Sequence, residues 1–268
     1  MKRGLSLCAF GTNLPDVAVL RFSKELGFEY VEGNAYSSQE LVDAKGNLHL
    51  DEALELYAAA GVRVHSMHGP CVDLSSPEDE ERSEGVRLCL AALEALHALG
   101  GSILVMHPAW PRDPDVPTEV RRQNSVESLK MLDDRCTAKG VRLAIENLLP
   151  VEGFSGSEEV LEIAQRVGET VGICFDSCHA SLTGEGLASM IEALAPHVIA
   201  THLSDSFLKD NDHYPPGLGR QDLVHVIEKL GTVGYEGVYN FELDVLSPKR
   251  LVAAVGKWMA ASVEPAKG

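Results

Sequence analysis

Carboxylate and imidazole side chains stand at the ends of several short apolar segments in this chain of 268 residues. Four of them each close one such segment: Glu146, Asp176, His202 and Glu242. If these side chains meet, three carboxylates share one pocket, and buried like charges cannot all stay ionised without a compensating cation. A divalent metal supplies that charge, and mixed oxygen and nitrogen ligands suit Mn²⁺ or Zn²⁺, with Co²⁺ and Mg²⁺ as alternatives.

The elements that would carry these residues alternate along the chain. Short apolar runs, typical of buried strands, occupy residues 5–10, 30–33, 62–68, 102–109, 142–148, 171–180, 198–205 and 238–244. Segments with apolar residues three and four positions apart, typical of amphipathic helices, occupy residues 17–27, 50–61, 85–100, 126–140, 160–168, 187–196, 223–234 and 251–261. The alternation predicts an α/β fold, a (β/α)8 TIM barrel that forms one domain over residues 1–268. A doubly wound sheet fits less well, because FGTNLPD rather than a G-x-G-x-x-G turn follows the first strand.

A barrel of this kind has its active site at the carboxyl ends of its strands, so the side chains that end the strands share one mouth. Six of the ten histidines fall there: His65, His68, His107, His179, His202 and His213. Side chains two positions before the strand ends lie one layer deeper, and most are small or polar: Val105, Ala144, Cys174, Ala200 and Asn240. We therefore expect a pocket below the mouth. His65 and His68 are three positions apart, so on a regular strand their side chains face opposite sides, and we expect His68 to face the barrel axis.

The composition argues against several classes of partner. Lys and Arg number 23 and Asp and Glu number 40, and the net charge of −17 disfavours nucleic acid and anionic membrane surfaces. The six cysteines form no C-x-x-C pair, which indicates reduced thiols. The sequence shows no apolar run long enough to span a membrane and no signal-like amino terminus, so we predict a cytoplasmic protein without a membrane partner. The sequence is compatible with an oligomer.

Seven motifs in strand-end positions resemble a known superfamily: VHSMHGP, VMHPA, LAIENL, CFDSCHA, THLSDS, DHYPPGLG and NFELD. In this order they resemble the xylose-isomerase-like TIM barrels, which include sugar isomerases and epimerases and the AP endonuclease family 2, or endonuclease IV-like, enzymes. The resemblance implies a metal site formed by Glu146, Asp176, His202 and Glu242. It also implies that Glu146 and Glu242 are catalytic and move a proton at the carbon beside a carbonyl, through a metal-stabilised enediolate.

Three further residues are candidate substrate contacts. The resemblance places His179 near a substrate oxygen. Glu32 ends the second strand, where it could touch a substrate hydroxyl. Gly217 lies in a Pro-Pro-Gly-Leu-Gly loop, where its backbone amide could meet a phosphate or carboxylate, although a simple tight turn fits the sequence equally well.

A second branch of the superfamily remains as an alternative. Eight positions match ligands of the three-zinc endonuclease, and they add four histidines to the core site: His68, His107, His179 and His213. The ninth position does not match, because Asn211-Asp212-His213 replaces the Asp-x-His motif of that branch. The charge, Cys71 in place of an intercalating aromatic residue, and the lack of a basic stripe count against DNA.

The sequence therefore predicts a divalent-metal-dependent sugar or sugar-acid isomerase or epimerase that acts on a small polyhydroxylated molecule. We expect between one and three metal ions. The alternatives are an endonuclease IV-like multi-zinc phosphodiesterase and a related metal-dependent lyase or dehydratase.

Overall fold

The structure is a computed structural model that describes residues 1–10, 17–25, 27–34, 51–109, 115–209, 213–243, 254–258 and 260. Several features singled out in the sequence lie outside the described residues. They are the FGTNLPD turn beyond its first residue, the connection at 35–49, Arg112, Asn211-Asp212, and the last predicted helix apart from residues 254–258 and 260, which are helical.

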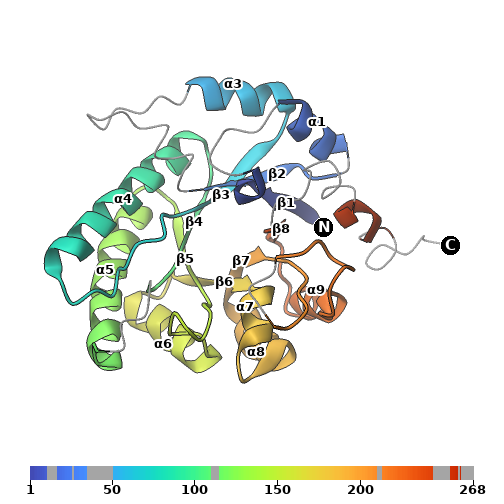
Figure 1. Cartoon of the computed structure of the whole chain (residues 1–268). Coiled ribbons are helices and arrows are strands. Elements are labelled where there is room, and N and C mark those ends of the chain that lie inside the picture. The colour runs from blue at the N-terminus through green and yellow to red at the C-terminus, as the bar shows by residue number, and fades with distance from the viewer. Residues whose placement is uncertain are drawn as a thin grey trace.

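Eight parallel strands form one sheet in the order β7-β6-β5-β4-β3-β2-β1-β8 (Figure 1). The strands are β1 (Lys2–Ser6), β2 (Tyr30–Gly33), β3 (Arg63–His68), β4 (Ile103–Met106), β5 (Arg142–Glu146), β6 (Gly172–Asp176), β7 (Val198–His202) and β8 (Val238–Phe241). The two ends of this order meet at a parallel bridge between Leu203 and Phe241. The predicted (β/α)8 TIM barrel is confirmed.

The seam between β7 and β8 is made differently from the other strand pairs. Leu203 N donates to Asn240 O over 2.9 Å. The Thr201 hydroxyl then bridges the two strands, because it accepts from Asn240 N over 2.9 Å and donates to Val238 O over 3.3 Å. A side chain therefore supplies part of the pairing at this seam.

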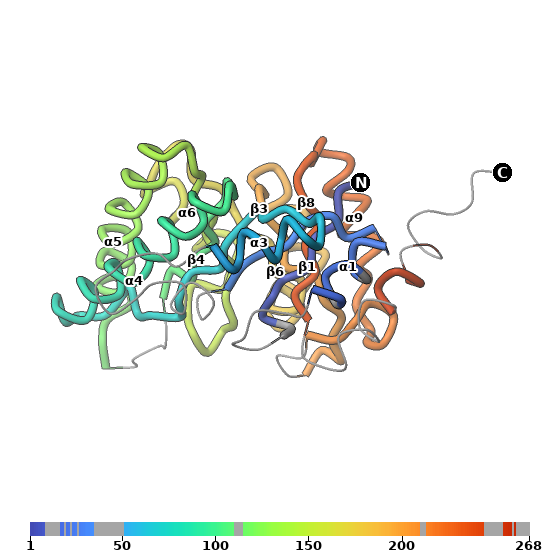
Figure 2. Tube along the Cα trace, turned by 90° about the horizontal axis from the view of Figure 1, so that it is seen from above, coloured from blue at the N-terminus to red at the C-terminus, as the bar shows by residue number. Residues whose placement is uncertain are grey.

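Helices surround the barrel on its outer side (Figure 1, Figure 2). The described helices are α1 (Val17–Glu25), α3 (Asp51–Ala60), α4 (Asp79–Ala98), α5 (Thr118–Ala138), α6 (Ser157–Val167), α7 (Ser177–Leu182), α8 (Gly186–Leu194) and α9 (Leu223–Thr232). Short 3-10 turns, η1 (Leu7–Phe10) and η2 (Ala195–His197), follow β1 and precede β7. Among the described residues, the structure contains no helix with the length and apolar character needed to cross a bilayer.

Two of the differences from the sequence prediction bear on the mouth of the barrel. The first strand covers Lys2–Ser6 rather than residues 5–10, because the chain from Lys2 to Leu5 pairs with β8 and then turns into η1. The apolar run at 171–180 holds a strand and a helix, because Asp176 ends β6 and caps α7 by accepting a hydrogen bond from His179 N over 2.6 Å. A buried helical turn continues the apolar signal of the strand, so hydrophobicity alone does not reveal the boundary.

The lumen of the barrel holds a small apolar cluster separate from the main core. Its buried members are those expected from the alternation of β4 to β7: Val105, Ala144, Cys174 and Ala200. The larger core fills the space between the barrel and its helices. Small residues therefore fill the lumen directly below the strand ends, which leaves room for polar side chains above them.

An irregularity in β3 brings a second histidine into the lumen. The pairing of β2 with β3 shifts next to Glu32, which therefore faces Ser66 rather than His65. His65 is inserted as an extra residue, and its Nε2 lies 3.1 Å from Ser66 Oγ. His68 faces the axis as expected, whereas the expectation that His65 turns away is wrong, because a bulge lets His65 and Ser66 turn to the same side.

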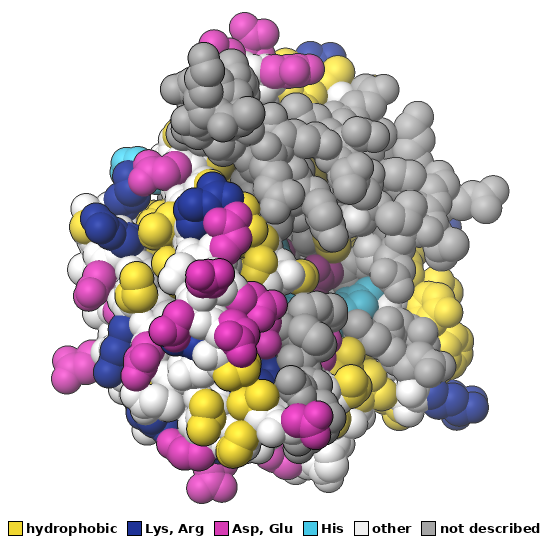
Figure 3. All heavy atoms as spheres, turned by 60° about the vertical axis from the view of Figure 1, so that its left-hand side comes forward, with side chains coloured by type: hydrophobic (Ala, Val, Ile, Leu, Met, Phe, Trp, Pro, Cys, Tyr) yellow, Lys and Arg dark blue, Asp and Glu magenta, His cyan; other side chains and the backbone are white. Residues whose placement is uncertain are grey.

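The outer surface around α4, α5 and α6 carries interspersed charges of both signs (Figure 3). Basic side chains in this region pair with acids one helical turn away: Arg82 with Asp79, Arg87 with Glu84, and Arg122 with Glu119. On the described residues of this face, Figure 3 shows no continuous basic stripe.

Candidate metal centre

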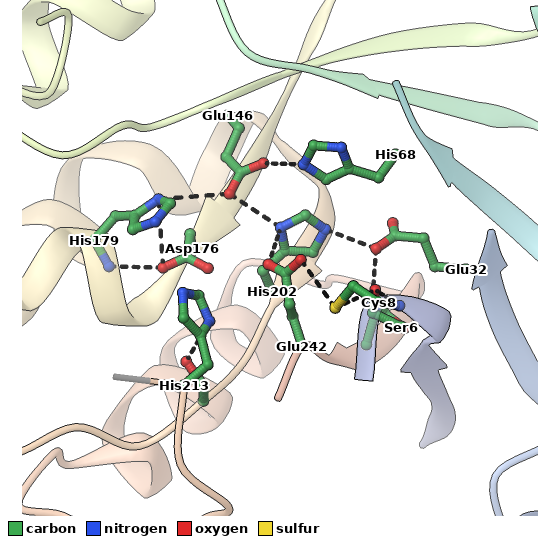
Figure 4. Close-up of polar contacts among 12 residues, drawn as sticks. Ser6, Cys8, Glu32, His68, Glu146, Asp176, His179, His202, His213 and Glu242 are labelled. Atoms are coloured by element: carbon green, nitrogen blue, oxygen red, sulfur yellow. Dashed lines mark hydrogen bonds and ion pairs between the residues drawn. The ribbon is translucent and has the colours of Figure 1, made fainter. Parts of the chain in front are cut away.

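The four core residues named from the sequence meet at the carboxyl ends of β5 to β8 (Figure 4). One potential ligand atom of each lies within 4.8 Å of the others: Glu146, Asp176, His202 and Glu242. The side chains of Glu146 and His202 are 1% and 0% exposed, whereas that of Glu242 is 15% exposed. Glu242 therefore forms the solvent-facing side of the cluster.

The His202 imidazole occupies the centre of this arrangement. Its Nδ1 lies 3.0 Å from Glu146 Oε1 and 3.0 Å from Glu242 Oε2. Its Nε2 lies 2.9 Å from Oε1 of Glu32, on the opposite edge of the ring. One imidazole thus connects two carboxylates at the mouth with a third below them.

A second group of potential ligands shares Glu146. Both His68 Nε2 and His107 Nε2 lie 3.4 Å from Glu146 Oε2. The His68 Nδ1 lies 2.7 Å from Gly69 O, so this nitrogen donates to the carbonyl and Nε2 is left to face the carboxylate. Both histidines were predicted from the sequence as candidate ligands, and both face Glu146 in the structure.

A third group contains Asp176, His179 and His213, whose potential ligand atoms also lie within 4.8 Å of one another. His179 Nδ1 is 3.7 Å from Asp176 Oδ1 and 3.5 Å from Glu146 Oε1. The His213 Nδ1 lies 3.3 Å from Ser204 Oγ. Asp176 and Glu146 therefore link this group to the core cluster.

Asn147 is a structural contributor that the sequence analysis did not single out. Its side chain binds the main chain of Asp176 at two points, with Nδ2 donating to O over 3.0 Å and Oδ1 accepting from N over 2.9 Å. Its own carbonyl lies 3.0 Å from His179 Nδ1. The available signal was a polar residue directly after Glu146 in an apolar run, since a polar side chain that becomes buried needs hydrogen-bond partners.

Burial and neighbouring charges shift the pKa values of the carboxylates. Burial raises the pKa of Asp176 to about 7, and Glu146 and Glu242 are among the groups that add to this increase. Burial would also raise the pKa values of Glu146 and Glu242, but the His202 imidazole holds both below their usual range. Glu146 and Glu242 are therefore ionised near neutral pH.

The pKa values of two imidazoles are raised rather than lowered. Burial would lower the pKa of His202, but nearby acidic groups, including Cys174 and Glu146, raise it well above its usual range. For His68, Glu146 likewise outweighs the effect of burial and raises the pKa to about 9. The carboxylates thus stabilise positive charge at the centre of the cluster.

The donor set fits a bound divalent cation. Two carboxylate oxygens, Glu146 Oε2 and Asp176 Oδ2, are buried and have no hydrogen-bond partner within the described part of the chain. Buried acceptors are normally satisfied, and a cation ligated by oxygen and nitrogen atoms would satisfy these. Glu146, Asp176, His202 and Glu242 are the residues that would hold it.

Two of the expected substrate contacts occupy other environments. Glu32 is fully buried below His202. The Gly217 amide donates to Asp205 Oδ2 over 2.9 Å, so this amide is engaged within the protein rather than directed at a ligand. In the structure both groups therefore have partners within the protein.

Comparison with curated proteins finds distant relatives. The chain is 27% identical over 256 residues to the uncharacterized protein y4fM of Sinorhizobium fredii, covering 82% of this chain and 78% of that protein. It is 28% identical over 159 residues to the inosose isomerase of Bacillus velezensis, covering 56% of each protein.

Solved structures share the fold at low sequence identity. The IOLI protein with a bound zinc atom matches with a TM-score of 0.81 at 21% identity, over 98% of both chains. The D-allulose 3-epimerase of a Methylomonas species, in complex with D-allulose, matches with a TM-score of 0.80 at 19% identity, over 98% of this chain and 97% of that one. The family model described as "Xylose isomerase-like TIM barrel" matches residues 20–261. The chain belongs to the xylose isomerase-like TIM barrel family.

Proposed function

We propose that this protein is a divalent-metal-dependent isomerase or epimerase of sugars, sugar acids or related polyhydroxylated ketones. The observation that carries this proposal is the pair of carboxylates Glu146 and Glu242, each 3.0 Å from His202 Nδ1. Of two carboxylates at one potential metal site, one can act as general base in its ionised form, and the other can act as general acid once it has taken up a proton from solvent.

The two glutamates differ in a way that suits paired proton transfer. Glu146 is almost fully buried at the end of β5, whereas Glu242 directly follows β8 and is partly exposed. The pKa values of both are lowered, so each can accept a proton from a carbon acid held between them. We infer that one glutamate removes the proton beside the carbonyl and that the other, after taking up a proton from solvent, donates it to the carbanion. When bound, a divalent cation would polarise the carbonyl and increase the acidity of that carbon.

The substrate class follows from the site and from the relatives. A mouth lined by carboxylates suits a neutral polyol held through a cation better than it suits a polyanion. The inosose isomerases among the relatives are named for a cyclic polyhydroxylated ketone. We therefore infer an inosose, a ketose or a related sugar acid as the substrate.

Hydrogen exchange with solvent tests this function directly. The protein, supplied with Mn²⁺ or Zn²⁺, is incubated in D₂O with inososes, ketoses and sugar acids, and deuterium at the carbon beside the carbonyl is followed by NMR. We expect exchange that falls by roughly 10²-fold or more in Glu146→Gln and in Glu242→Gln, because each is a general acid or base.

A control is Glu94→Gln, which changes a glutamate of the outer helix α4 that pairs with Lys139 over 2.8 Å rather than with any residue of the cluster. Exchange should persist in this variant. No exchange across the panel with metal bound, or undiminished exchange in both active-site variants, would rule out the proton-transfer role.

A second function is favoured by one specific observation, the presence of three adjoining groups of potential ligands. The groups centred on His68 with His107, and on Asp176 with His179 and His213, extend the core site toward a multinuclear centre. We infer an endonuclease IV-like phosphodiesterase as the alternative. Three metal ions per chain together with incision of an abasic duplex at about 0.1 M salt, lost in Glu146→Gln, would establish this alternative.

A further inference from the structure

A fully buried carboxylate lies beside the His202 ring, on the edge of the ring that faces away from Glu146 (Figure 4). Glu32, at the end of β2, has its Oε1 2.9 Å from His202 Nε2. Asn240 Nδ2 donates to the same oxygen over 3.1 Å, and Ser66 Oγ donates to Oε2 over 2.7 Å. Hydrogen-bond donors from three other strands therefore surround Glu32, which is closed off from the solvent.

These contacts determine which nitrogen of His202 carries a proton. A carboxylate oxygen only accepts hydrogen bonds, so Nε2, which faces Glu32, must be the donor. In a neutral imidazole one nitrogen donates and the other offers a lone pair. Nδ1 faces Glu146 and Glu242, so a proton on this nitrogen is the one that a cation held by the two glutamates would displace, and the lone pair of the neutral ring then lies on Nδ1. Glu32 thus selects the form of His202 that can bind a cation on the side of the mouth.

The packing around Glu32 shows that its position is fixed by the barrel itself. Ser66 faces Glu32 only because the bulge in β3 inserts His65 ahead of it. Asn240 lies in the lumen two residues before Glu242, so the strand that carries a candidate ligand also holds Glu32 in place. The bulge and the buried amide therefore orient the carboxylate, and the carboxylate orients the imidazole.

We propose that Glu32 is a positioning residue that fixes the tautomer and the ring orientation of His202 for cation binding through Nδ1. This inference rests on the proposed function, because it requires the cluster to bind a divalent cation. A carboxylate behind a ligating histidine makes the ligand more basic, and the loss of such a partner typically weakens metal binding by 10–100-fold. Glu32 acts without touching the substrate.

The first test measures Zn²⁺ affinity in Glu32→Gln by competition with a chromophoric chelator. Glutamine keeps the shape of the side chain but removes its charge, and we expect Zn²⁺ binding to weaken by about 10-fold or more. Glu94→Gln is the control, because it neutralises a glutamate of the outer helix α4 that pairs with Lys139, and its Zn²⁺ affinity should equal that of the wild type. Circular dichroism of each variant confirms that it is folded.

The second test uses the wild-type protein and therefore does not depend on the folding of a variant. In a ¹⁵N-histidine NMR spectrum of the Zn²⁺-loaded protein, His202 should show a protonated Nε2 and a metal-bound Nδ1. Coordination through Nε2 would overturn the inference, as would Zn²⁺ affinity in Glu32→Gln within twofold of the wild type. A wild-type protein that binds no divalent cation would instead overturn the proposed metal centre, and with it this inference.

Discussion

The loop after β7 depends on one buried carboxylate, and replacing that carboxylate gives a sharp test of how the mouth is built. Asp205 accepts four main-chain hydrogen bonds of 2.9 Å, with Oδ1 bound by Ser206 and Gln221 and Oδ2 by Gly217 and Gly219. In Asp205→Asn, one oxygen becomes an NH₂ group that faces two N–H donors. We expect the fold to lose at least the two hydrogen bonds on that side.

The magnitude follows from those two bonds. A hydrogen bond to a charged group contributes about 1.5–3 kcal/mol, so two of them amount to about 3 kcal/mol at the lower limit. In Asp205→Asn the loop can relax until its freed N–H groups bind water, and we therefore expect a loss at the lower limit. The free energy of unfolding, measured by urea denaturation, should therefore fall by about 3 kcal/mol.

Asp222→Asn provides the matched control for this change. Asp222 caps α9 by accepting a hydrogen bond from His225 N over 3.0 Å in an exposed position. Asparagine is an equally good cap, so the free energy of unfolding should change by no more than about 0.5 kcal/mol. If Asp205→Asn destabilises the protein no more than Asp222→Asn does, the four main-chain contacts do not stabilise the loop as the structure indicates.

Two further predictions concern the metal centre and the lumen. Asp176→Ala removes a fully buried oxygen ligand, so metal content after dialysis should fall strongly, and full occupancy at the same site would contradict the ligand assignment. Burial lowers the pKa of His65 from 6.5 to about 4, so the unfolded chain binds more protons between these values and stability falls as the pH drops through this window. The loss amounts to at most about 3 kcal/mol, and urea denaturation at pH 7 and pH 4.5 should show a smaller difference in His65→Gln than in the wild type.

Much of the candidate site could be predicted because strand ends are easy to recognise in a parallel barrel. Polar residues that interrupt an apolar run stand out, and the topology brings them to one mouth. Glu146 and His202 were predicted in this way, and the structure places them 3.0 Å apart. The small residues two positions earlier, such as Ala144 and Ala200, likewise form the predicted lumen cluster.

The rest of the site could not be predicted, because it depends on contacts between residues that are far apart in the sequence. The bulge that turns His65 inward is a register shift between two strands, and sequence periodicity within β3 does not show it. The contact of Glu32 with His202 joins residues 170 positions apart. The amide of Gly217 is directed at Asp205, a partner that only the folded loop brings near.

Metal binding at the mouth is expected to stabilise the seam between β7 and β8. His202 ends one of these strands and Glu242 follows the other, so the two residues stand on opposite sides of the weakest-paired edge. A cation shared by both would act as a cross-link that completes the ring where main-chain pairing is sparse. Amide hydrogen exchange at Leu203 should therefore slow when metal binds, as expected for a ligand that binds only the closed form.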